Sequence, residues 1–289
     1  MAVAGDHLGG VAGRFDCCIE VLGTPFSIGT DSIDAAALVT CFFAAFAVGE
    51  APAVPESRRY AIVAPRAGGP VGLYQDGVRV FVHDSAAQVL GVLVGEINLA
   101  ALDAYRGLAV HAGVVARGSH AVAFPGASGA GKSTLAAACL LAGFDYVSDE
   151  ALCIDYASSA VVPYAKPLKL SAAALRLIGA PAEIVAGGRD EVEVVASQLS
   201  AVASAAPLHL AEVVRLSRSP GPPRLERLPS AQVVTSLLQF SFNHFKQPGQ
   251  AFELSTRLAH SCRAWDLVYA DPGDAARLLW DSLRESPGR

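Results

Sequence analysis

A glycine-rich segment between two apolar runs carries the residues best suited to chemistry in this sequence. From Gly126 to Ser133 it follows the spacing G-x-x-x-x-G-K-[ST], the pattern of a phosphate-binding P-loop. A strand-like apolar run (residues 121–124) precedes it and a helical run (residues 135–142) follows it. This strand–loop–helix context separates a working P-loop from a chance match. The segment therefore predicts that the chain binds a nucleoside triphosphate.

The residues of this loop have separate roles in the predicted site. Glycines let the backbone approach phosphates, and successive N–H groups at a helix N-terminus provide a positive cradle. Lys132 would reach the β- and γ-phosphates of ATP, and the Ser133 hydroxyl would contact Mg²⁺. The expected nucleotide contacts are Gly126, Ala127, Ser128, Gly129, Ala130, Gly131, Lys132, Ser133 and Thr134.

An acidic pair and a histidine are the next candidates. Asp149 and Glu150 follow the predicted helix in a strand segment, where a second Mg²⁺ contact or a general base is needed. An acidic turn facing solvent is the alternative for this pair. His111 lies in an apolar strand, where an ionisable side chain needs a partner or a cavity. Considered alone, His111 is better interpreted as a core histidine whose hydrogen bonds are satisfied than as a functional residue.

The register of these residues resembles the catalytic domain of HPr kinase/phosphorylase, whose fold is similar to that of phosphoenolpyruvate carboxykinase. His111 stands fifteen residues before Gly126, and the helix, Gly143 and the acidic pair follow in order. The match covers residues 111–154, about a sixth of the chain. The resemblance implies an α/β fold with a P-loop on a mixed sheet.

The same resemblance implies roles for individual residues. His111 matches the active-site histidine of the family, Lys132 its P-loop lysine, and Ser133 its Mg²⁺-binding hydroxyl. Asp149 and Glu150 match an aspartate pair, one member of which accepts the proton. Glutamate in the second place extends the reach by one methylene, so the identity of the base stays open between the two. We expect Asp149 to support the metal and Glu150 to accept the proton.

The family's glycine-rich signature after the acidic pair has no counterpart here, so phosphorolysis is not implied. In the family, this signature also carries a further Mg²⁺-binding glutamate. The candidates for this missing carboxylate, by proximity in sequence alone, are Glu183, Glu191 and Glu193. The chain is more similar to HPr-kinase-related kinases, some of which accompany ribosomally made peptides such as lasso peptides. The shared segments are His111-Ala-Gly113, Ser148-Asp-Glu150 and Lys166-Pro167. Characterised members phosphorylate a serine of a precursor peptide, so this resemblance implies a kinase.

Several cations follow the acidic pair. Lys166 is a candidate contact for phosphate or for the acceptor, with a solvated loop as the alternative, whereas Lys169 is expected in solvent. Their spacing of three would direct them to opposite faces of an extended segment. Arg257 and Arg263 are weaker candidates for approaching a γ-phosphate. Asn243, Lys246 and His260 are interpreted as surface or helix-end residues.

Composition narrows the class of protein. The 289 residues are 52% hydrophobic and 17% charged, with a net charge of −5, so the chain lacks the basic excess of a general nucleic-acid binder. Its six cysteines form no C-x-x-C pair, which indicates free thiols in a reducing compartment. The most apolar run, residues 35–48, is shorter than the roughly 20 residues that span a bilayer. We therefore expect a cytoplasmic protein that does not bind membranes.

The chain divides into two expected modules. Residues 1–106 form a β-rich N-terminal module around one apolar helix (about residues 33–48), with a hairpin that turns at Asp76-Gly77. This module would bind the peptide or mediate assembly, and a homo-oligomer stays open. Residues 107–289 form the nucleotide-binding catalytic domain, in which strands and helices alternate as in α/β proteins.

The leading hypothesis is an ATP- and Mg²⁺-dependent kinase that phosphorylates a hydroxyl, foremost serine in a peptide or protein. A kinase for a small-metabolite hydroxyl is the second hypothesis. The third is a nucleotide-dependent regulatory module that hydrolyses slowly or not at all. A short acceptor pocket lined by apolar residues, in place of an open groove, would favour the second hypothesis.

Overall fold

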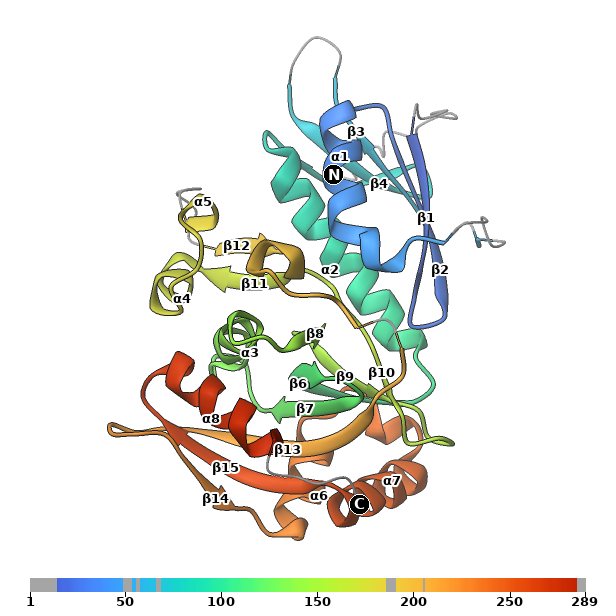
Figure 1. Cartoon of the computed structure of the whole chain (residues 1–289). Helices are drawn as coiled ribbons and strands as arrows, with labels where there is room; N and C mark the ends of the chain where they lie inside the picture. The colour runs from blue at the N-terminus through green and yellow to red at the C-terminus, as the bar shows by residue number, and fades with distance from the viewer. Residues whose placement is uncertain are drawn as a thin grey trace, which may run out of the picture. The chain divides into compact units, whose positions relative to one another are not determined.

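The computed structural model describes residues 15–48, 54–55, 58–65, 69–185, 191–204 and 206–284. Contacts between Cα atoms divide the chain into two units, Met1–Tyr105 and Arg106–Arg289. Both units combine helices with β-sheet (Figure 1), so the protein belongs to the mixed α/β class and has a β-rich N-terminal part.

The N-terminal unit is built on a five-stranded sheet in the order β1-β2-β3-β4-β5. The strands are β1 (Phe15–Val21), β2 (Thr24–Thr30), β3 (Arg59–Val63), β4 (Val71–Gln75) and β5 (Val78–His83). β2 and β3 are parallel, and the other neighbours are antiparallel. The predicted hairpin is confirmed: Asp76 and Gly77 both have positive φ and join β4 to β5. Leu22 and Gly23 also have positive φ and form the turn between β1 and β2. Strand β2 therefore begins directly after this turn, at Thr24.

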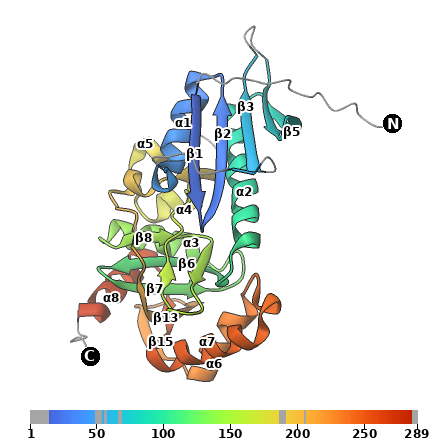
Figure 2. The ribbon, with the colours of Figure 1, turned by 90° about the vertical axis from the view of Figure 1, so that its right-hand side faces the viewer.

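Two helices pack against this sheet. Helix α1 (Ile33–Phe43) begins where the Ser32 hydroxyl accepts a hydrogen bond of 3.3 Å from the Ala35 amide. It ends five residues before the predicted end at Val48, and a short 3₁₀ turn, η1 (Ala44–Phe46), follows. Helix α2 (Ala86–Ala104) contacts α1, β4 and β5. Figure 2 shows β1, β2 and β3 side by side with these helices beside them.

Helix α2 is also the one helix in the described part of the chain that is long and apolar enough to cross a membrane, by length and composition alone. One face of it is buried in the N-terminal unit. The buried residues are Val89, Leu90, Leu93, Val94, Ile97, Ala101 and Leu102. Their spacing of three and four residues is that of a helix face packed on a core.

The second unit is built on an eight-stranded mixed sheet in the order β10-β9-β6-β7-β13-β15-β14, with β8 also paired to β6. The strands are β6 (Leu108–Arg117), β7 (His120–Pro125), β8 (Asp145–Ser148), β9 (Ala151–Ile154), β10 (Val161–Val162), β13 (His209–Arg218), β14 (Arg224–Arg227) and β15 (Arg263–Tyr269). β13 is parallel to both β7 and β15, and the remaining pairs are antiparallel.

Helices cover both faces of this sheet (Figure 1). One face packs against α3 (Lys132–Leu141) and α8 (Pro272–Arg284), and the other against α6 (Ser230–Gln239) and α7 (Pro248–Ser261). The alternation of side chains along a strand explains the two cores. Val114 and Ala116 of β6 belong to the core with α6 and α7, whereas Val115 belongs to the core with α3 and α8.

A two-stranded antiparallel sheet lies beside α3. It consists of β11 (Leu168–Ser171) and β12 (Glu191–Val194), and Leu168, Leu170 and Val194 join the core around α3. The short elements nearby are α4 (Ala172–Leu177), α5 (Ala182–Val185) and η3 (Ala196–Leu199), while η4 (His244–Lys246) precedes α7. The sequence shows little pattern over residues 181–206, of which 186–190 and 205 lie outside the described residues.

Candidate functional site

The glycine-rich loop (residues 126–131) joins the buried strand β7 to helix α3. Gly129 and Gly131 have φ values of +80° and +91°, a left-handed conformation that costs residues with a Cβ about 1–2 kcal/mol. Gly131 directly precedes α3, and its carbonyl accepts the first helical hydrogen bond, from Leu135, at 2.9 Å. The amides of the first helical turn have no partner within a helix. The turn therefore presents N–H groups where an anion can bind.

The side chain of Lys132 points back toward the first residues of this loop. It is buried, and Nζ donates hydrogen bonds of 2.9 Å to the Gly126 carbonyl and 2.7 Å to the Ala127 carbonyl. Burial lowers the pKa of the ammonium, while Asp149 and Glu150 oppose that shift. The cation is thus held at the beginning of the loop, close to two carboxylates.

An interrupted strand brings these two carboxylates to the loop. Strands β8 and β9 both pair antiparallel with β6, with Ser148 opposite Val114 and Ala151 opposite His111. Asp149 and Glu150 occupy the interruption between β8 and β9. The Glu150 carbonyl accepts a hydrogen bond of 3.2 Å from the Ala112 amide, which ties the interruption to β6. Since β7 pairs with the other edge of β6, the acidic pair lies one strand away from the loop.

A glycine on β6 lets helix α3 approach this strand. A Cβ placed on Gly113 would lie 3.4 Å from the Lys132 carbonyl oxygen and 3.5 Å from its Cβ. A Cβ at this position would be in ordinary van der Waals contact, whereas a side chain longer than that of alanine would push the start of α3 away from β6. The approach therefore favours a small residue at the third position of the segment His111-Ala-Gly113.

Asp149 is the most deeply buried acid of the site. Burial raises the pKa of its carboxyl to about 6, although Lys166 and the Ser133 hydroxyl lower it. Oδ2 accepts a hydrogen bond of 3.4 Å from the Lys169 amide. Oδ1 is buried and has no hydrogen-bond partner among the residues that the structure describes. An unpartnered buried carboxylate oxygen is costly unless a cation or a donor fills its place.

Glu150 and His111 complete the arrangement around Lys132. Glu150 Oε2 lies 3.4 Å from Nζ of Lys166, itself buried. The half-buried His111 ring stacks on Phe242 with 5.5 Å between ring centroids. Burial lowers the pKa of His111, Lys132 and Lys166 lower it further, and Glu150 opposes them. The imidazole is therefore neutral near pH 7.

The structure thus brings most of the predicted site residues together. We call one group of five the charged cluster: His111, Lys132, Asp149, Glu150 and Lys166. Ser133 and Thr134 follow Lys132 in the first turn of α3, and Ala127, Ser128 and Gly129 form the exposed tip of the loop. Electrostatic interactions are stronger in such a partly buried site than at an exposed surface.

Other candidates lie elsewhere. Lys169 is exposed and forms an ion pair of 2.6 Å with Glu191, as the odd spacing from Lys166 predicts. Arg257 contacts Glu253 and the Tyr156 carbonyl.

The second of the two weaker candidates, Arg263, pairs with the fully buried Glu212, which stabilises the β13–β15 region rather than the loop. Of the three acids considered for the missing carboxylate, Glu183 is exposed and Glu191 is held by Lys169. Glu193 is near both lysines, Lys166 and Lys169, although burial raises its pKa.

The interpretation of Asn243 as a surface or helix-end residue is corrected in part. It starts η4, but its side chain is buried, where Oδ1 accepts from the Ala109 amide at 3.0 Å and Nδ2 donates to the Gly107 carbonyl at 2.9 Å. Asn243 therefore fixes the start of β6, and its neighbour Phe242 stacks on His111. No local sequence signal distinguishes this asparagine, because its partners are more than 130 residues away.

Arg218 is a further residue that the sequence did not single out. A Cβ on Gly131 would lie 3.0 Å from Nη2 of Arg218 and 3.4 Å from the Tyr269 hydroxyl. The guanidinium lies over the Tyr269 ring, 4.7 Å from its centroid, and donates to the Ala270 carbonyl at 3.2 Å. Arg218 and Tyr269 therefore brace the loop from the side of β13 and β15.

The donor atoms near the loop suit Mg²⁺. Mg²⁺ takes oxygen ligands, and it binds through one or two carboxylates while keeping several waters. The Asp149 carboxylate, with its unpartnered Oδ1, and the nearby Ser133 hydroxyl supply such oxygens. Within the described ranges, no group of three or more His, Cys, Asp or Glu side chains could hold a metal ion. Further ligands would have to be water or phosphate oxygens.

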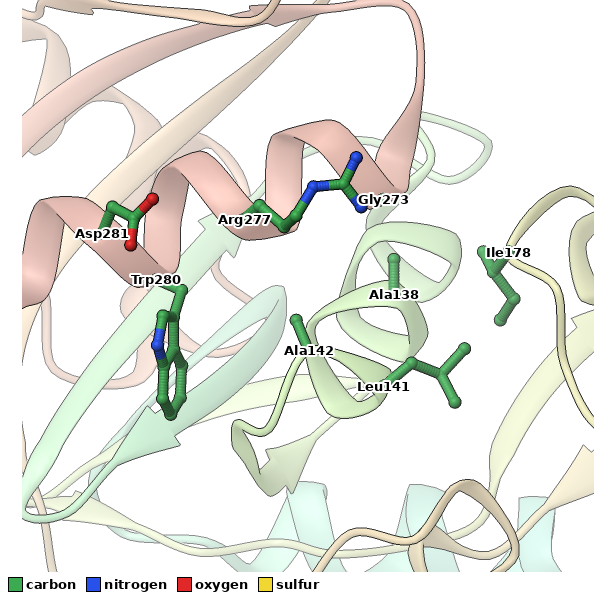
Figure 3. A pocket seen from close by; sticks show the side chains of 8 residues that line it. All are labelled: Ala138, Leu141, Ala142, Ile178, Gly273, Arg277, Trp280 and Asp281. Atoms are coloured by element: carbon green, nitrogen blue, oxygen red, sulfur yellow. The ribbon is translucent and has the colours of Figure 1, made fainter.

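A cavity of about 470 Å³ in the second unit lies away from this chemistry, between α8 and the C-terminal end of α3. Figure 3 shows Arg277 and Trp280 of α8 on one side of it and Ala138 and Leu141 of α3 on the other. No residue of the charged cluster lines this cavity.

Neither the comparison with protein-family models nor the comparison with curated proteins finds a match to this chain.

Proposed function

We propose that the unit Arg106–Arg289 is a kinase that transfers the γ-phosphate of ATP to a hydroxyl group, that of serine in a peptide or protein. The observation that carries this proposal is the charged cluster. Two buried lysines, Lys132 and Lys166, meet the carboxylates Asp149 and Glu150 beside a loop that leads into the first turn of helix α3. Phosphoryl transfer requires this combination of cations, a metal ligand and a proton acceptor.

The loop amides and Lys132 would bind the triphosphate. Lys132 Nζ would exchange its bonds to the Gly126 and Ala127 carbonyls for the β- and γ-phosphate oxygens, which neutralises their charge. Asp149 and Ser133 would hold Mg²⁺. When bound, this ion would neutralise phosphate charge and align the triphosphate.

Glu150 would receive the proton of the acceptor hydroxyl. Its ion pair with Lys166 orients the carboxylate, and Lys166 adds positive charge near the phosphoryl group. His111, neutral because burial lowers its pKa, can exchange a hydrogen bond with the acceptor hydroxyl without adding charge. The resemblance to kinases of ribosomal peptides supports a peptide acceptor, foremost a precursor peptide.

We also propose that the protein acts in the cytoplasm and binds neither nucleic acid nor membrane. All six cysteines are free thiols, as is usual in a reducing compartment. The net charge of −5 supplies no basic excess for binding to a nucleic-acid backbone.

The test is phosphoryl transfer from γ-labelled ATP with Mg²⁺ to a library of serine-containing peptides and to a panel of small metabolites. We expect labelled peptide serine with the unaltered protein and none with Glu150→Gln. Label on metabolites alone would replace the peptide acceptor with a small molecule. Tight ATP binding without transfer would identify a regulatory module and refute the kinase proposal.

A further inference from the structure

A smaller cavity lies beside the glycine-rich loop, on the side of β13 and α6. Its volume is about 330 Å³, near the lower end of the roughly 300–1,000 Å³ of small-molecule sites. We call it the α6 groove. Its walls include Gly126 and Ala127 of the loop and Gln232, Thr235, Ser236 and Gln239 of α6.

The α6 side chains that line this groove are polar and uncharged, whereas Pro125, Ala130, Leu216 and Phe240 contribute apolar surface to the rest of its lining. The four α6 side chains are spaced by three, four and seven residues and so share one helix face. Helix α6 contains no Asp, Glu, Lys or Arg, whereas an exposed helix face is usually charged. Arg215 also lines the groove. Its guanidinium is engaged, because it donates to Gln232 Oε1 at 2.7 Å and pairs with Asp266.

The groove lies where the terminal phosphate of a bound triphosphate would be. The carbonyls of Gly126 and Ala127, on the groove wall, hold Lys132 Nζ, and this lysine marks the β- and γ-phosphate end. Phe240 also lines the groove, and its carbonyl accepts a hydrogen bond of 2.7 Å from the His111 amide. The groove therefore borders the charged cluster at the end where an acceptor must arrive, not at the end of the nucleobase.

We propose that the α6 groove binds the uncharged backbone of the peptide beside the acceptor hydroxyl. Amide and hydroxyl side chains both donate and accept hydrogen bonds, as do the N–H and C=O groups of a peptide backbone. Gln232, Thr235 and Gln239 are exposed, so the groove is open along α6. An open groove suits a chain that passes through it, whereas a small molecule is usually enclosed over most of its surface. This inference rests on the proposed kinase function.

A pair of matched threonines provides the test. Thr235 in the groove and Thr256 on α7 each donate a hydrogen bond of 2.9 Å to the carbonyl four residues earlier. Thr256 is on the same face of the sheet but does not line the groove. Thr235→Trp would fill the groove, and Thr256→Trp would add the same bulk elsewhere. The probes are the serine-peptide library with γ-labelled ATP, Mg²⁺–ATP binding by calorimetry, and thermal unfolding.

We expect Thr235→Trp to lower kcat/KM for the labelled peptides about tenfold, with ATP affinity and melting temperature unchanged. Thr256→Trp should label peptides as the unaltered protein does. Weaker ATP binding by Thr235→Trp would assign the groove to the nucleotide. Equal peptide labelling by Thr235→Trp and Thr256→Trp would show that the groove has no role in binding the peptide. Each of these two results would overturn the proposal. Metabolite labelling that Thr235→Trp alone reduces would overturn the peptide occupant. If the unaltered protein labels no peptide, the peptide acceptor of the proposed function fails first and this occupant fails with it.

Discussion

The two sides of the glycine-rich loop differ in how they hold charge. On the side of β6, β8 and β9, the charged cluster contains two buried lysines and a buried acid. On the side of β13 and α6, the α6 groove presents exposed amides and hydroxyls from a helix without charged residues. The same loop therefore borders a region of strong, partly desolvated charge and a region of neutral hydrogen-bonding groups.

This difference separates two tasks that a phosphotransferase must combine. Charged groups with little access to water stabilise phosphoryl charge in the transition state. Exposed neutral groups contribute little to that charge, but they can select an acceptor through hydrogen bonds. Changes in the charged cluster should therefore act on kcat or on binding of the Mg²⁺–nucleotide complex, and changes in the α6 groove on kcat/KM for the acceptor.

The largest effect is expected from Lys132→Ala. Loss of the ammonium removes the proposed cation at the β- and γ-phosphates, and transfer should fall by about 10³-fold or more. Thermal unfolding should still show a cooperative transition, because the hydrogen bonds that this ammonium makes among the described residues go to two carbonyls of the loop and not to the sheet. A folded variant with full activity would show that the loop does not bind the transferred phosphate.

Substitutions of the two adjacent acids, Asp149 and Glu150, should impair different properties of the protein. Glu150→Gln removes the proposed proton acceptor and should lower kcat by about 10²-fold at saturating Mg²⁺. Asp149→Asn removes the proposed metal ligand, so its activity should recover partly as Mg²⁺ is raised. Titration of the transfer rate against Mg²⁺ distinguishes them. The opposite pattern would exchange their roles, which the sequence leaves open.

Lys166 and Lys169 form a matched pair three residues apart. Lys166 is buried and 3.4 Å from Glu150, whereas Lys169 is exposed and bound to Glu191. Lys166→Ala should reduce kcat about tenfold through loss of charge at the site, and Lys169→Ala should leave it within about twofold, as for exposed ion pairs. Steady-state rates of both variants decide the point. Equal losses would mean that burial does not set the contribution of these lysines.

The bracing of the loop by Arg218 can be tested on two glycines. Gly129 and Gly131 both have positive φ, but only Gly131 has another group close to the position of a Cβ. Gly129→Ala should cost about 1–2 kcal/mol of loop stability from φ alone, and Gly131→Ala should cost more because Arg218 must move. Mg²⁺–ATP affinity measures the difference. Equal affinities for the two variants would show that Arg218 does not restrain the loop.

Local spacing accounts for what the sequence predicts well. The glycines of residues 126–131 and the Asp76-Gly77 turn restrict the backbone by themselves, so loop and hairpin follow from neighbouring residues. The acidic pair can also be predicted from local spacing, because it follows α3 after only a few residues. The sequence also predicts a strand segment around the acidic pair, but not that β8 and β9 both pair with β6, which is what brings Asp149 to the loop.

Contacts between distant segments account for what the sequence does not reveal. Asn243 holds the start of β6 across more than 130 residues, and Arg218 meets a loop that ends nearly 90 residues earlier. Such pairs leave no periodic pattern, because a single polar side chain near a helix or strand end has many possible partners. The α6 groove likewise cannot be predicted from the sequence, because it combines residues 126–127 with a helix that begins more than 100 residues later.

The smallest expected effect concerns the pH dependence of stability in the Mg²⁺-free protein. Burial raises the pKa of Asp149 from its ordinary value of 3.8 to about 6. Between these values the folded state keeps a proton that the unfolded state has released, so this group makes stability fall as pH rises from about 4 to about 6, with no further loss above. Asp149→Asn lacks the titrating group, while Glu150, Lys166 and the Ser133 hydroxyl are common to both proteins.

Urea unfolding of the two proteins across this pH range isolates the contribution. Asp149→Asn should gain stability relative to the unaltered protein as pH rises through the window, and the difference should level off above about pH 6. Glu150→Gln, in which Asp149 is retained, should keep the fall. A constant difference between the unaltered protein and Asp149→Asn would mean that Asp149 is ionised throughout. Burial would then not govern the charge of Asp149, and the contrast between the two sides of the loop would lose its electrostatic basis.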